Sequence, residues 1–329
     1  MRIKIISLSA AVFFLLWGFP CAAGPVHISE GDRVLVVAPH PDDETLGTGG
    51  LIQSALAAKA GVKVVYFTHG EHNEIASIFY KKKPLLLQSD FIGNGQIRKK
   101  EAARATAVLG LKNEDLIFLG YPDFGTLLIW QKHWGNVKRY RSFLTRINKV
   151  PYPDDFSYGS GYTGENIVRD FESILLSYRP THVFVTAPFD LNSDHQAAYL
   201  FLNVALFNIR GQWEPRALYV YLVHAHRWPR PVKFSPLSAL SPPLSLPGGA
   251  SKGKLDWVLY PLAHDQIDKK KEAILRYESQ VAYEKTFLLS FARANELFLE
   301  MPPEVWRSPV RPRQARRPRA DGKSGSVGR

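Results

Sequence analysis

A histidine and three carboxylates stand together in the sequence, directly after a short apolar run. The four residues are, in chain order, His40, Asp42, Asp43 and Glu44. Pro39 and Pro41 fix their own φ angles and restrict their neighbours, so a stiff loop carries the group. Catalytic zinc sites use imidazole and carboxylate ligands and keep one position for water, and an adjacent carboxylate that points elsewhere is free to act as a base. The sequence therefore predicts metal-assisted chemistry on this loop.

The three carboxylates also have a structural interpretation. Acidic residues are favoured at the N-cap and in the first turn of a helix, where they complement the helix dipole. We favour this capping role for Glu44 alone. Asp42 and Asp43 are expected to take part in the chemistry.

A second polar cluster follows a later apolar strand. The strand is predicted at 182–186, and the cluster comprises Asn192, Ser193, Asp194, His195 and Gln196. Ser193 and Gln196 have the spacing of a capping box, so His195 is expected in the first turn of the next helix, facing the sheet edge. A third ligand for the predicted metal site would have to lie at this edge of the sheet.

Helices and strands alternate along the chain, which is the pattern of a βα repeat. We predict an α/β protein, a three-layer Rossmann-like fold with a mostly parallel central sheet. The apolar residues 34–38 are expected as a strand buried on both faces, whose polar continuation lies at the ligand-binding carboxyl edge. Further strands are expected at 62–68, 182–186 and 216–223, and helices at 45–60, 96–109, 163–178 and, as a pair, 264–300.

The predicted helix at 45–60 contains three glycines, which are poor helix formers. They are Gly47, Gly49 and Gly50. Their presence predicts that another part of the backbone or core approaches closely near the site.

The run at 38–50, Ala-Pro-His-Pro-Asp-Asp-Glu-Thr-Leu-Gly-Thr-Gly-Gly, resembles the opening signature of the LmbE/PIG-L family. These are zinc-dependent deacetylases that hydrolyse N-acetylglucosamine-type amides. The resemblance implies that His40 and Asp43 hold zinc and that Asp42 is the general base.

The family's second signature, His-Pro-Asp-His, aligns with residues 192–195. This resemblance implies that His195 completes the zinc site and that its neighbour Asp194 is retained, while the first histidine is replaced by Asn192. The family associates that histidine with help to the carbonyl oxygen during attack. A neutral asparagine amide donates one hydrogen bond but transfers no proton, so we expect a second histidine to assist, first His264 and then His226.

Two further residues gain interest only from the resemblance. Without the resemblance, Arg98 would be interpreted as one half of a surface ion pair. In the family, an arginine followed later by a run like Leu119-Gly-Tyr-Pro-Asp123 occurs in the same order, which implies that Arg98 and Asp123 contact the sugar. The resemblance ends with the closing pattern at 271–280.

The chain ends have compositions of their own. Residues 1–23 combine two basic residues, an apolar core shorter than a membrane span and small residues before Gly24, which predicts a secretory signal peptide and a periplasmic or secreted protein. Residues 24–306 are expected to form the deacetylase domain. Cys21, the single cysteine, would leave with the signal, so His and carboxylate must hold any metal.

The positive charge lies mainly outside the predicted domain. Of the net charge of +12, residues 1–23 carry +2 and residues 307–329 carry +7, so only +3 remains for residues 24–306. The basic, proline-containing tail at 307–329 is expected to be disordered. It is either without a role or a contact for an anionic membrane or polymer, and nucleic acid is not expected as a partner.

Several other aromatic and histidine residues have open interpretations. The connection at 69–95 is a candidate substrate loop, and the aromatic-rich stretch at 124–162 is either a saccharide platform or, as we favour, a covering loop. His69 and His72 are expected at the surface. His224 and His226 follow a strand, where we favour an ordinary strand-end position over the rim of the site.

The predicted function is zinc-dependent removal of the acetyl group from an N-acetylglucosamine-type amino sugar or glycan outside the cytoplasm, with about one zinc per chain. One alternative is an amidase for another N-acyl group. Another is a catalytically silent saccharide-binding protein, which the presence of Asp42 argues against.

Overall fold

Seven strands form one sheet in the order β3-β2-β1-β4-β5-β7-β6. The computed structural model describes residues 25–72, 87–246 and 255–308. The strands are β1 (Arg33–Ala38), β2 (Gly61–Thr68), β3 (Leu116–Tyr121), β4 (His182–Thr186), β5 (Ala217–Tyr221), β6 (Trp257–Pro261) and β7 (Asn295–Glu300). The pairs β1–β2, β1–β4, β2–β3 and β4–β5 are parallel, and β7 runs antiparallel to both neighbours. The predicted α/β class with a mostly parallel sheet is confirmed.

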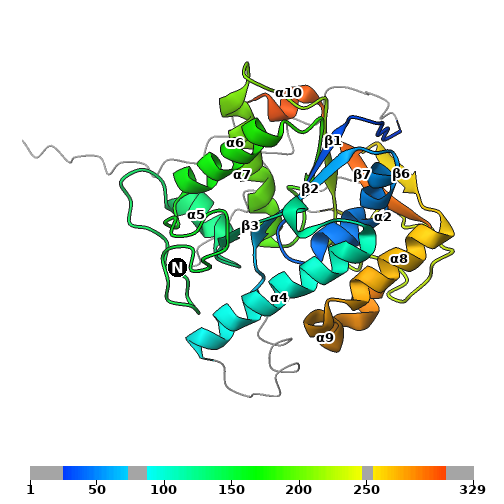
Figure 1. Ribbon diagram of the computed structural model, residues 1–329, viewed down its shortest axis with the longest axis horizontal. Helices are drawn as coiled ribbons and strands as arrows, with labels where there is room; N and C mark the ends of the chain where they lie inside the picture. Colours follow the sequence, from blue (N-terminus) through cyan, green and yellow to red (C-terminus); the bar gives the residue numbers. More distant parts are fainter. Residues whose placement is uncertain (1–24, 73–86, 247–254, 309–329) are drawn as a thin grey trace, which may run out of the picture.

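Helices cover both faces of the sheet, which gives three layers (Figure 1). One layer contains α2 (Asp43–Ala57), α4 (Gln88–Leu109), α8 (His264–Leu275) and α9 (Glu278–Leu289). The other contains α5 (Thr126–Lys132), α6 (Gly164–Tyr178), α7 (Ser193–Ile209) and α10 (Pro303–Trp306), and a short 3₁₀ helix, η2 (Asn113–Asp115), precedes β3.

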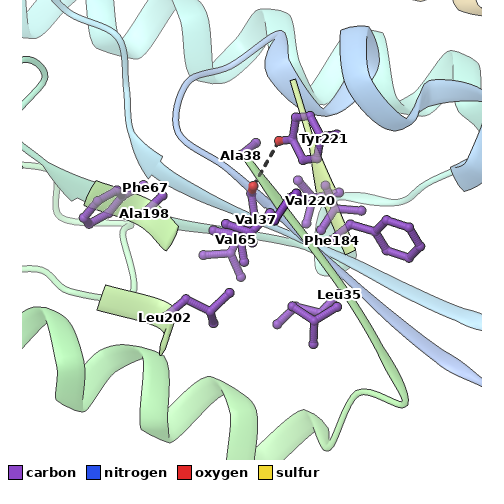
Figure 2. Packing of buried hydrophobic residues seen from close by; sticks show 14 of the residues in the cluster. Leu35, Val37, Ala38, Val65, Phe67, Phe184, Ala198, Leu202, Val220 and Tyr221 are labelled. Atoms are coloured by element: carbon purple, nitrogen blue, oxygen red, sulfur yellow. Dashed lines mark hydrogen bonds between the residues drawn. The ribbon is translucent and has the colours of Figure 1, made fainter. Parts of the chain in front are cut away.

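The core is centred on β1 and β4, which lie in the middle of the sheet. The side chains at 34–38 are fully buried, as the unbroken apolar run predicts. Figure 2 shows this packing, with Leu202 of α7 on one side of the sheet and Tyr221 on the other. The Tyr221 hydroxyl donates to the carbonyl of Val37 at 3.0 Å. Burial of each larger aliphatic side chain of β1 contributes about 1.5–3 kcal/mol to the free energy of folding.

Helix α2 packs closely because it presents glycines to its neighbours. A Cβ on Gly47 would overlap the ring of Tyr221, and a Cβ on Gly50 would overlap the side chain of Leu262. The predicted close approach near the site is therefore present. It lets the first turn of α2, which begins at Asp43, lie against the end of β1.

A buried ion pair holds the middle of α2 from the C-terminal part of the chain. Glu296 on β7 accepts the backbone N–H groups of Gly50 at 2.7 Å and Leu51 at 2.8 Å, and it pairs with Lys270 on α8 at 2.6 Å. The two charged side chains are at most 1% exposed. A buried carboxylate with three donors is satisfied, so this contact fixes α2 against the sheet.

The predicted pair of helices at 264–300 is only partly correct. Helices α8 and α9 are present, but residues 295–300 form the central strand of the β5-β7-β6 antiparallel unit. Leu297 and Leu299 alternate with other residues, which is compatible with a strand, and pairing with distant β5 decides the outcome. Strands β3 and β6 were not predicted as strands.

Parts of the chain ends and loops carry no structural description. The predicted signal peptide at 1–23 and the tail beyond residue 308 lie outside the described residues, as does the lysine run at 81–83. At the start of the predicted tail, Arg307 pairs with Glu214 at 2.7 Å, so this residue is ordered against the body of the protein. Among the described residues, no helix is both long enough and apolar enough to cross a bilayer.

Candidate metal and active site

The candidate site lies at the carboxyl ends of β1 and β4. The chain leaves β1 toward β2 and leaves β4 toward β5, in opposite directions from the middle of the sheet. This topological switch point is where open α/β sheets bind ligands. The loop that carries His40 follows β1, and the cluster that ends in His195 follows β4.

Three potential ligand atoms form a compact triangle at this place. Nδ1 of His40 lies 3.2 Å from Oδ2 of Asp43 and 3.2 Å from Nε2 of His195, and the last two atoms are 3.1 Å apart. All three residues are buried. The structure thus brings together the three predicted metal ligands, which come from two segments far apart in the sequence.

The triangle fits a tetrahedral metal ion. Zinc with bonds of about 2.0–2.1 Å places neighbouring ligand atoms about 3.3 Å apart, close to the distances found here. The surroundings also favour a cation, because five buried carboxylates lie close to the two histidines, while Arg98 pairs with Asp42. The five carboxylates belong to Asp42, Asp43, Asp123, Asp190 and Asp194. A buried excess of negative charge needs protons or a metal ion to compensate it.

The two imidazoles respond to this charge. Burial alone would lower the pKa of His40, but the charge of Asp123 raises this pKa well above its ordinary value. Burial alone would lower the pKa of His195, but the charges of Asp190 and then Asp43 raise it to about 9. Conversely, despite burial, the charge of His195 holds the pKa of Asp43 well below its ordinary range.

Another possible group of ligands comprises His40, Asp123 and Asp194. Its carboxylates already have backbone donors: Asp123 accepts the N–H of His72 at 2.9 Å, and Asp194 accepts the N–H groups of Phe124 at 2.6 Å and Thr126 at 3.2 Å. Asp43 also accepts a backbone N–H, that of His40 at 2.9 Å, but only through Oδ2, whereas both oxygens of Asp123 and both oxygens of Asp194 have backbone donors. The first group is therefore the better candidate for a metal, and Asp123 and Asp194 have an orienting position.

The two carboxylates orient His40 through its second nitrogen. Nε2 of His40 lies 3.0 Å from Oδ1 of Asp123 and 3.5 Å from Oδ2 of Asp194. A partner on the far nitrogen fixes the ring and its tautomer and increases its basicity toward a metal. Asp194, predicted as a neighbour of the site, lies at this second nitrogen. Asp123, predicted to contact sugar, lines the pocket, but its carboxylate binds His40 and the backbone N–H groups of His72 and Phe124.

Asp190 has the corresponding position at His195, and sequence reasoning did not single it out. Its Oδ2 lies 3.2 Å from Nδ1 of His195, although the ring nitrogen is not aligned for a hydrogen bond. The same carboxylate accepts backbone N–H groups of Asn192 at 2.9 Å, Val223 at 3.0 Å and His224 at 2.9 Å. Its position in the short connection between β4 and α7, the helix that carries His195, is the feature of the sequence that could have indicated this role.

Asp42, the predicted base, stands beside the ligands but belongs to neither ligand group. Its φ angle is +124°, a region that non-glycine residues rarely occupy, and such strain is concentrated at functional sites. Burial raises the pKa of Asp42 well above its usual value, against the opposing charge of Arg98. The side chain is 11% exposed and the residue lines a pocket, so Asp42 can contact a ligand there.

Arg98, predicted to contact substrate, binds mainly the protein. Its guanidinium donates to the carbonyls of Gly70 at 2.8 Å and Pro41 at 2.7 Å, and to Oδ2 of Asp42 at 3.0 Å. These contacts place Arg98 beneath the His40 loop. Its first role in this structure is to hold Asp42 and the preceding proline in position.

A pocket of about 450 Å³ opens above the triangle, a size typical of small-molecule sites. Its wall combines polar residues of the β1 and β4 loops with aromatic and apolar residues of α9. The lining residues include His40, Asp42, Asp43, Arg98, Asn192, His224, Tyr283 and Phe287.

The structure does not bring the predicted assisting histidines to this pocket. His264 is the first residue of α8, where it is exposed and outside the pocket lining, because α8 packs on α2 and α4 through other residues. His226 is also exposed. His224, for which an ordinary strand-end position was favoured, lines the pocket instead.

The surface position predicted for His69 is wrong. The side chain is fully buried, with its nitrogens 3.0 Å from the carbonyl of Gly95 and 2.6 Å from Asp155. His72 is partly buried and lines the pocket. The predicted long connection at 69–95 is shorter than expected because α4 already begins at Gln88.

A sequence model of the family described as PIG-L, GlcNAc-PI de-N-acetylase, matches residues 35–206, just over half of the chain. The chain belongs to this family. The segment that matches the PIG-L family contains all three metal-ligand candidates together with Asp42 and Asn192, so the expected membership is confirmed on the residues that form the site.

Curated relatives match the PIG-L region over shorter stretches. The 1D-myo-inositol 2-acetamido-2-deoxy-alpha-D-glucopyranoside deacetylase of Mycolicibacterium smegmatis is 40% identical over 83 residues, which are 25% of this chain and 28% of that protein. The enzyme of the same name from Mycobacterium avium is 50% identical over 48 residues, 15% of this chain and 16% of that protein. The chain thus spans less than a third of the length of these relatives.

Solved structures extend the likeness to most of the fold. N,N'-diacetylchitobiose deacetylase from Pyrococcus horikoshii superimposes with a TM-score of 0.50 at 18% identity, covering 82% of this chain and 84% of the other. The A40926 pseudoaglycone deacetylase Dbv21 gives a TM-score of 0.50 at 16% identity, covering 83% and 98%. At these identities the likeness shows a shared fold.

Proposed function

We propose that this protein is a zinc-dependent hydrolase that removes the acetyl group from an N-acetylglucosamine-type amino sugar or glycoconjugate. The observation that carries the proposal is the triangle of His40, Asp43 and His195 ligand atoms beside a buried carboxylate that is not a ligand, Asp42. Three protein ligands and one free base are the parts that metal-assisted amide hydrolysis requires.

The metal would be held by Nδ1 of His40, Oδ2 of Asp43 and Nε2 of His195. When bound there, a zinc ion supplies Lewis acidity, which polarises a carbonyl and brings the pKa of water toward neutrality. The ring orientations are fixed from behind, by Asp123 and Asp194 at His40 and by Asp190 at His195.

The proton transfers fall to Asp42. Its carboxylate takes a proton from the attacking water and later gives it to the nitrogen of the leaving amine. Arg98 holds Oδ2 of Asp42 at 3.0 Å, so the second carboxylate oxygen is the one available to the pocket. This arrangement keeps the base off the metal and beside the reacting atoms.

The named activities of the relatives support the substrate class. The curated relatives are deacetylases of a 2-acetamido-2-deoxy-glucopyranoside, and the structural neighbours cited above are a diacetylchitobiose deacetylase and a pseudoaglycone deacetylase. The names of the curated relatives and of the diacetylchitobiose enzyme describe N-acetylated amino sugars. The partly exposed rings of Tyr283 and Phe287 give the pocket wall apolar faces on which a pyranose ring can stack.

Export from the cytoplasm is part of the proposal and depends on the sequence of residues 1–23 alone. Contact of the basic tail with an anionic membrane or polymer is likewise proposed from the sequence of residues 307–329 alone. Mass spectrometry of protein from the medium and the periplasm tests the first point, since a mature chain beginning at Gly24 is expected. Intact chain found only in the cytoplasm would exclude export.

Activity is tested with the full chain after metal analysis. Release of free amine and of acetate is measured with N-acetylglucosamine, diacetylchitobiose and an N-acetylglucosaminyl-inositol, beside an N-acetyl amino acid and an N-butanoyl sugar. We expect one zinc per chain and release of equal amounts of amine and acetate from at least one acetylated sugar. Cleavage of only the non-sugar or longer-acyl substrates would identify another amidase, and tight sugar binding without cleavage would identify a silent binding protein.

A further inference from the structure

His224 lines the same pocket as two of the proposed metal ligands, His40 and Asp43. The residue follows β5, and its backbone N–H donates to Asp190 at 2.9 Å. Its ring centre lies 4.9 Å from that of His195 and 6.0 Å from that of Phe287, to which it is stacked with an interplanar angle of 9°. The backbone contact and the two rings fix the imidazole in one orientation.

The polar atoms of this ring have no protein partner. Among the described residues, neither nitrogen of His224 makes a hydrogen bond, although the ring lines the pocket and is only partly exposed. Buried and half-buried imidazoles normally satisfy at least one nitrogen. An oriented imidazole with open nitrogens on a pocket wall therefore indicates contact with a ligand.

His224 does not belong to the metal site. The two groups of potential ligand atoms within 4.8 Å of one another, searched over the described residues, include His40 and His195 but not His224. His224 therefore lies next to the proposed ligand His195, with the ring centres 4.9 Å apart, and lines the pocket without belonging to either group.

Asn192 faces the pocket from the other loop and is partly engaged. Its Oδ1 accepts the backbone N–H of Asp194 at 2.8 Å, which caps α7. Because a backbone N–H is a donor, the atom facing it must be the amide oxygen, and the amide NH₂ is directed away from the cap. The pocket is therefore lined by a capping asparagine on one loop and an unpaired imidazole on the other.

We propose that His224 is a further catalytic residue, whose imidazole N–H donates a hydrogen bond to the carbonyl oxygen of the bound N-acetyl group. This inference rests on the proposed deacetylation. As water attacks, negative charge grows on that oxygen, and a fixed donor stabilises the charge more in the transition state than in the substrate. The neutral imidazole is a sufficient donor, so no change in its protonation is needed.

The test compares two variants at 224 with a matched control. His224→Phe keeps a flat ring against His195 and Phe287 but removes both nitrogens, whereas His224→Gln retains an N–H donor. His226→Phe, two residues further and exposed, is the control. For each protein, kcat, KM, zinc content and thermal unfolding are measured. Affinities for glucosamine and for a methylphosphonamidate analogue of the tetrahedral intermediate are determined by calorimetry.

We expect His224→Phe to lower kcat by about 100- to 1,000-fold, as for removal of one oxyanion donor, with KM and zinc content close to those of the wild type. The same variant should lose at least about tenfold in affinity for the charged analogue and little for glucosamine. His224→Gln should recover part of both losses, and His226→Phe should show neither.

Three outcomes would overturn the inference. Loss of zinc in both variants at 224 would make His224 a ligand or a support of the metal site. Equal loss of analogue and glucosamine affinity would make it a packing residue. Unchanged kcat in His224→Phe would leave it without a catalytic role while the proposed function stands. Wild-type protein that releases no amine from any acetylated sugar would overturn the proposed function, and this inference with it.

Discussion

Oδ2 of Asp190 lies 3.2 Å from Nδ1 of His195, on the opposite side of the imidazole from Asp43. The ring is thus set between a carboxylate that would share the metal with it and a carboxylate that would orient it. Asp190 also fixes the backbone of Asn192 and His224, so one side chain connects the ligand, the capping asparagine and the unpaired imidazole.

Asp190→Asn should weaken zinc binding by about 10- to 100-fold, the usual cost of losing a partner behind a metal-bound histidine. Competition titration with a chromogenic chelator measures the change. His195→Ala, which removes a ligand, should lose zinc far more completely and serves as the upper limit. An Asp190→Asn protein with native zinc affinity would show that the backbone contacts of Asp190 are its whole role.

Asp42→Asn should retain zinc and lose activity. The substitution keeps the shape of the side chain and the contact with Arg98 but removes the proton acceptor, so kcat should fall by about 100- to 10,000-fold. Zinc content by elemental analysis and kcat by amine release are measured on the same preparation. Near-native turnover would place the base elsewhere.

Arg98→Lys distinguishes two roles for this residue. The ammonium of lysine cannot bind Gly70, Pro41 and Asp42 together, so the His40 loop should loosen. We expect kcat to fall by at least about tenfold, a lower Tm, and a KM within a factor of about three of the wild type, since Arg98 here positions Asp42. A large rise in KM with unchanged kcat would instead support the sugar contact predicted from the sequence.

Glu71 should make stability depend on pH. Burial, and then the charge of Asp123, raises the pKa of Glu71 from 4.5 to about 8. The folded state therefore keeps a proton that the unfolded chain releases above pH 4.5, and the free energy of unfolding falls as pH rises toward about 8. Glu71→Gln stays neutral and should lack this loss, which is at most about 1.4 kcal/mol per pH unit.

Urea denaturation of metal-free wild type and Glu71→Gln, at several pH values between about 5 and about 8, measures the difference between the two proteins. The comparison isolates Glu71, because the histidines and aspartates of the site are common to both. Parallel stability curves would show that Glu71 is ionised in the folded protein throughout this range.

Removal of residues 309–329 should leave kcat and KM on a small soluble acetylated sugar unchanged. The cut preserves Arg307 and its ion pair with Glu214, and Trp306 beneath it remains buried. If the tail binds anionic vesicles or polymers, the truncated protein should lose that binding, and the binding of the full chain should weaken with salt. A lower Tm after truncation would show that the tail stabilises the fold.

The sequence was sufficient for the parts of the site that depend on local pattern. An unbroken apolar run predicts the buried strand that ends before His40. The polar cluster at 192–196 predicts the helix turn that carries His195, although the cap is Asn192 and the predicted capping box of Ser193 and Gln196 is not formed. Two parallel strands with polar ends must meet at one edge of the sheet, so even the contact between these distant segments follows from the fold class.

What could not be predicted depends on pairing between distant segments. Residues 295–300 contain good helix formers, and only the partners β5 and β6 make them a strand. His224 and His226 differ by two positions and look equivalent in the sequence, but the turn after β5 directs the first into the pocket and the second to solvent. Asp190 stands in the loop already singled out, yet its importance comes from the groups that surround it.

The contact of Glu296 with the middle of α2 has a consequence for where this protein can be divided. The family match ends at residue 206, but the helix that begins with Asp43 is held by a carboxylate from β7. The segment that the family model matches is thus smaller than the segment expected to fold as one cooperative unit. Amide hydrogens of β7 and of the first turns of α2 are therefore expected to exchange in the same opening event. Separation of β7 from the sheet would then also disorder the loop that carries His40.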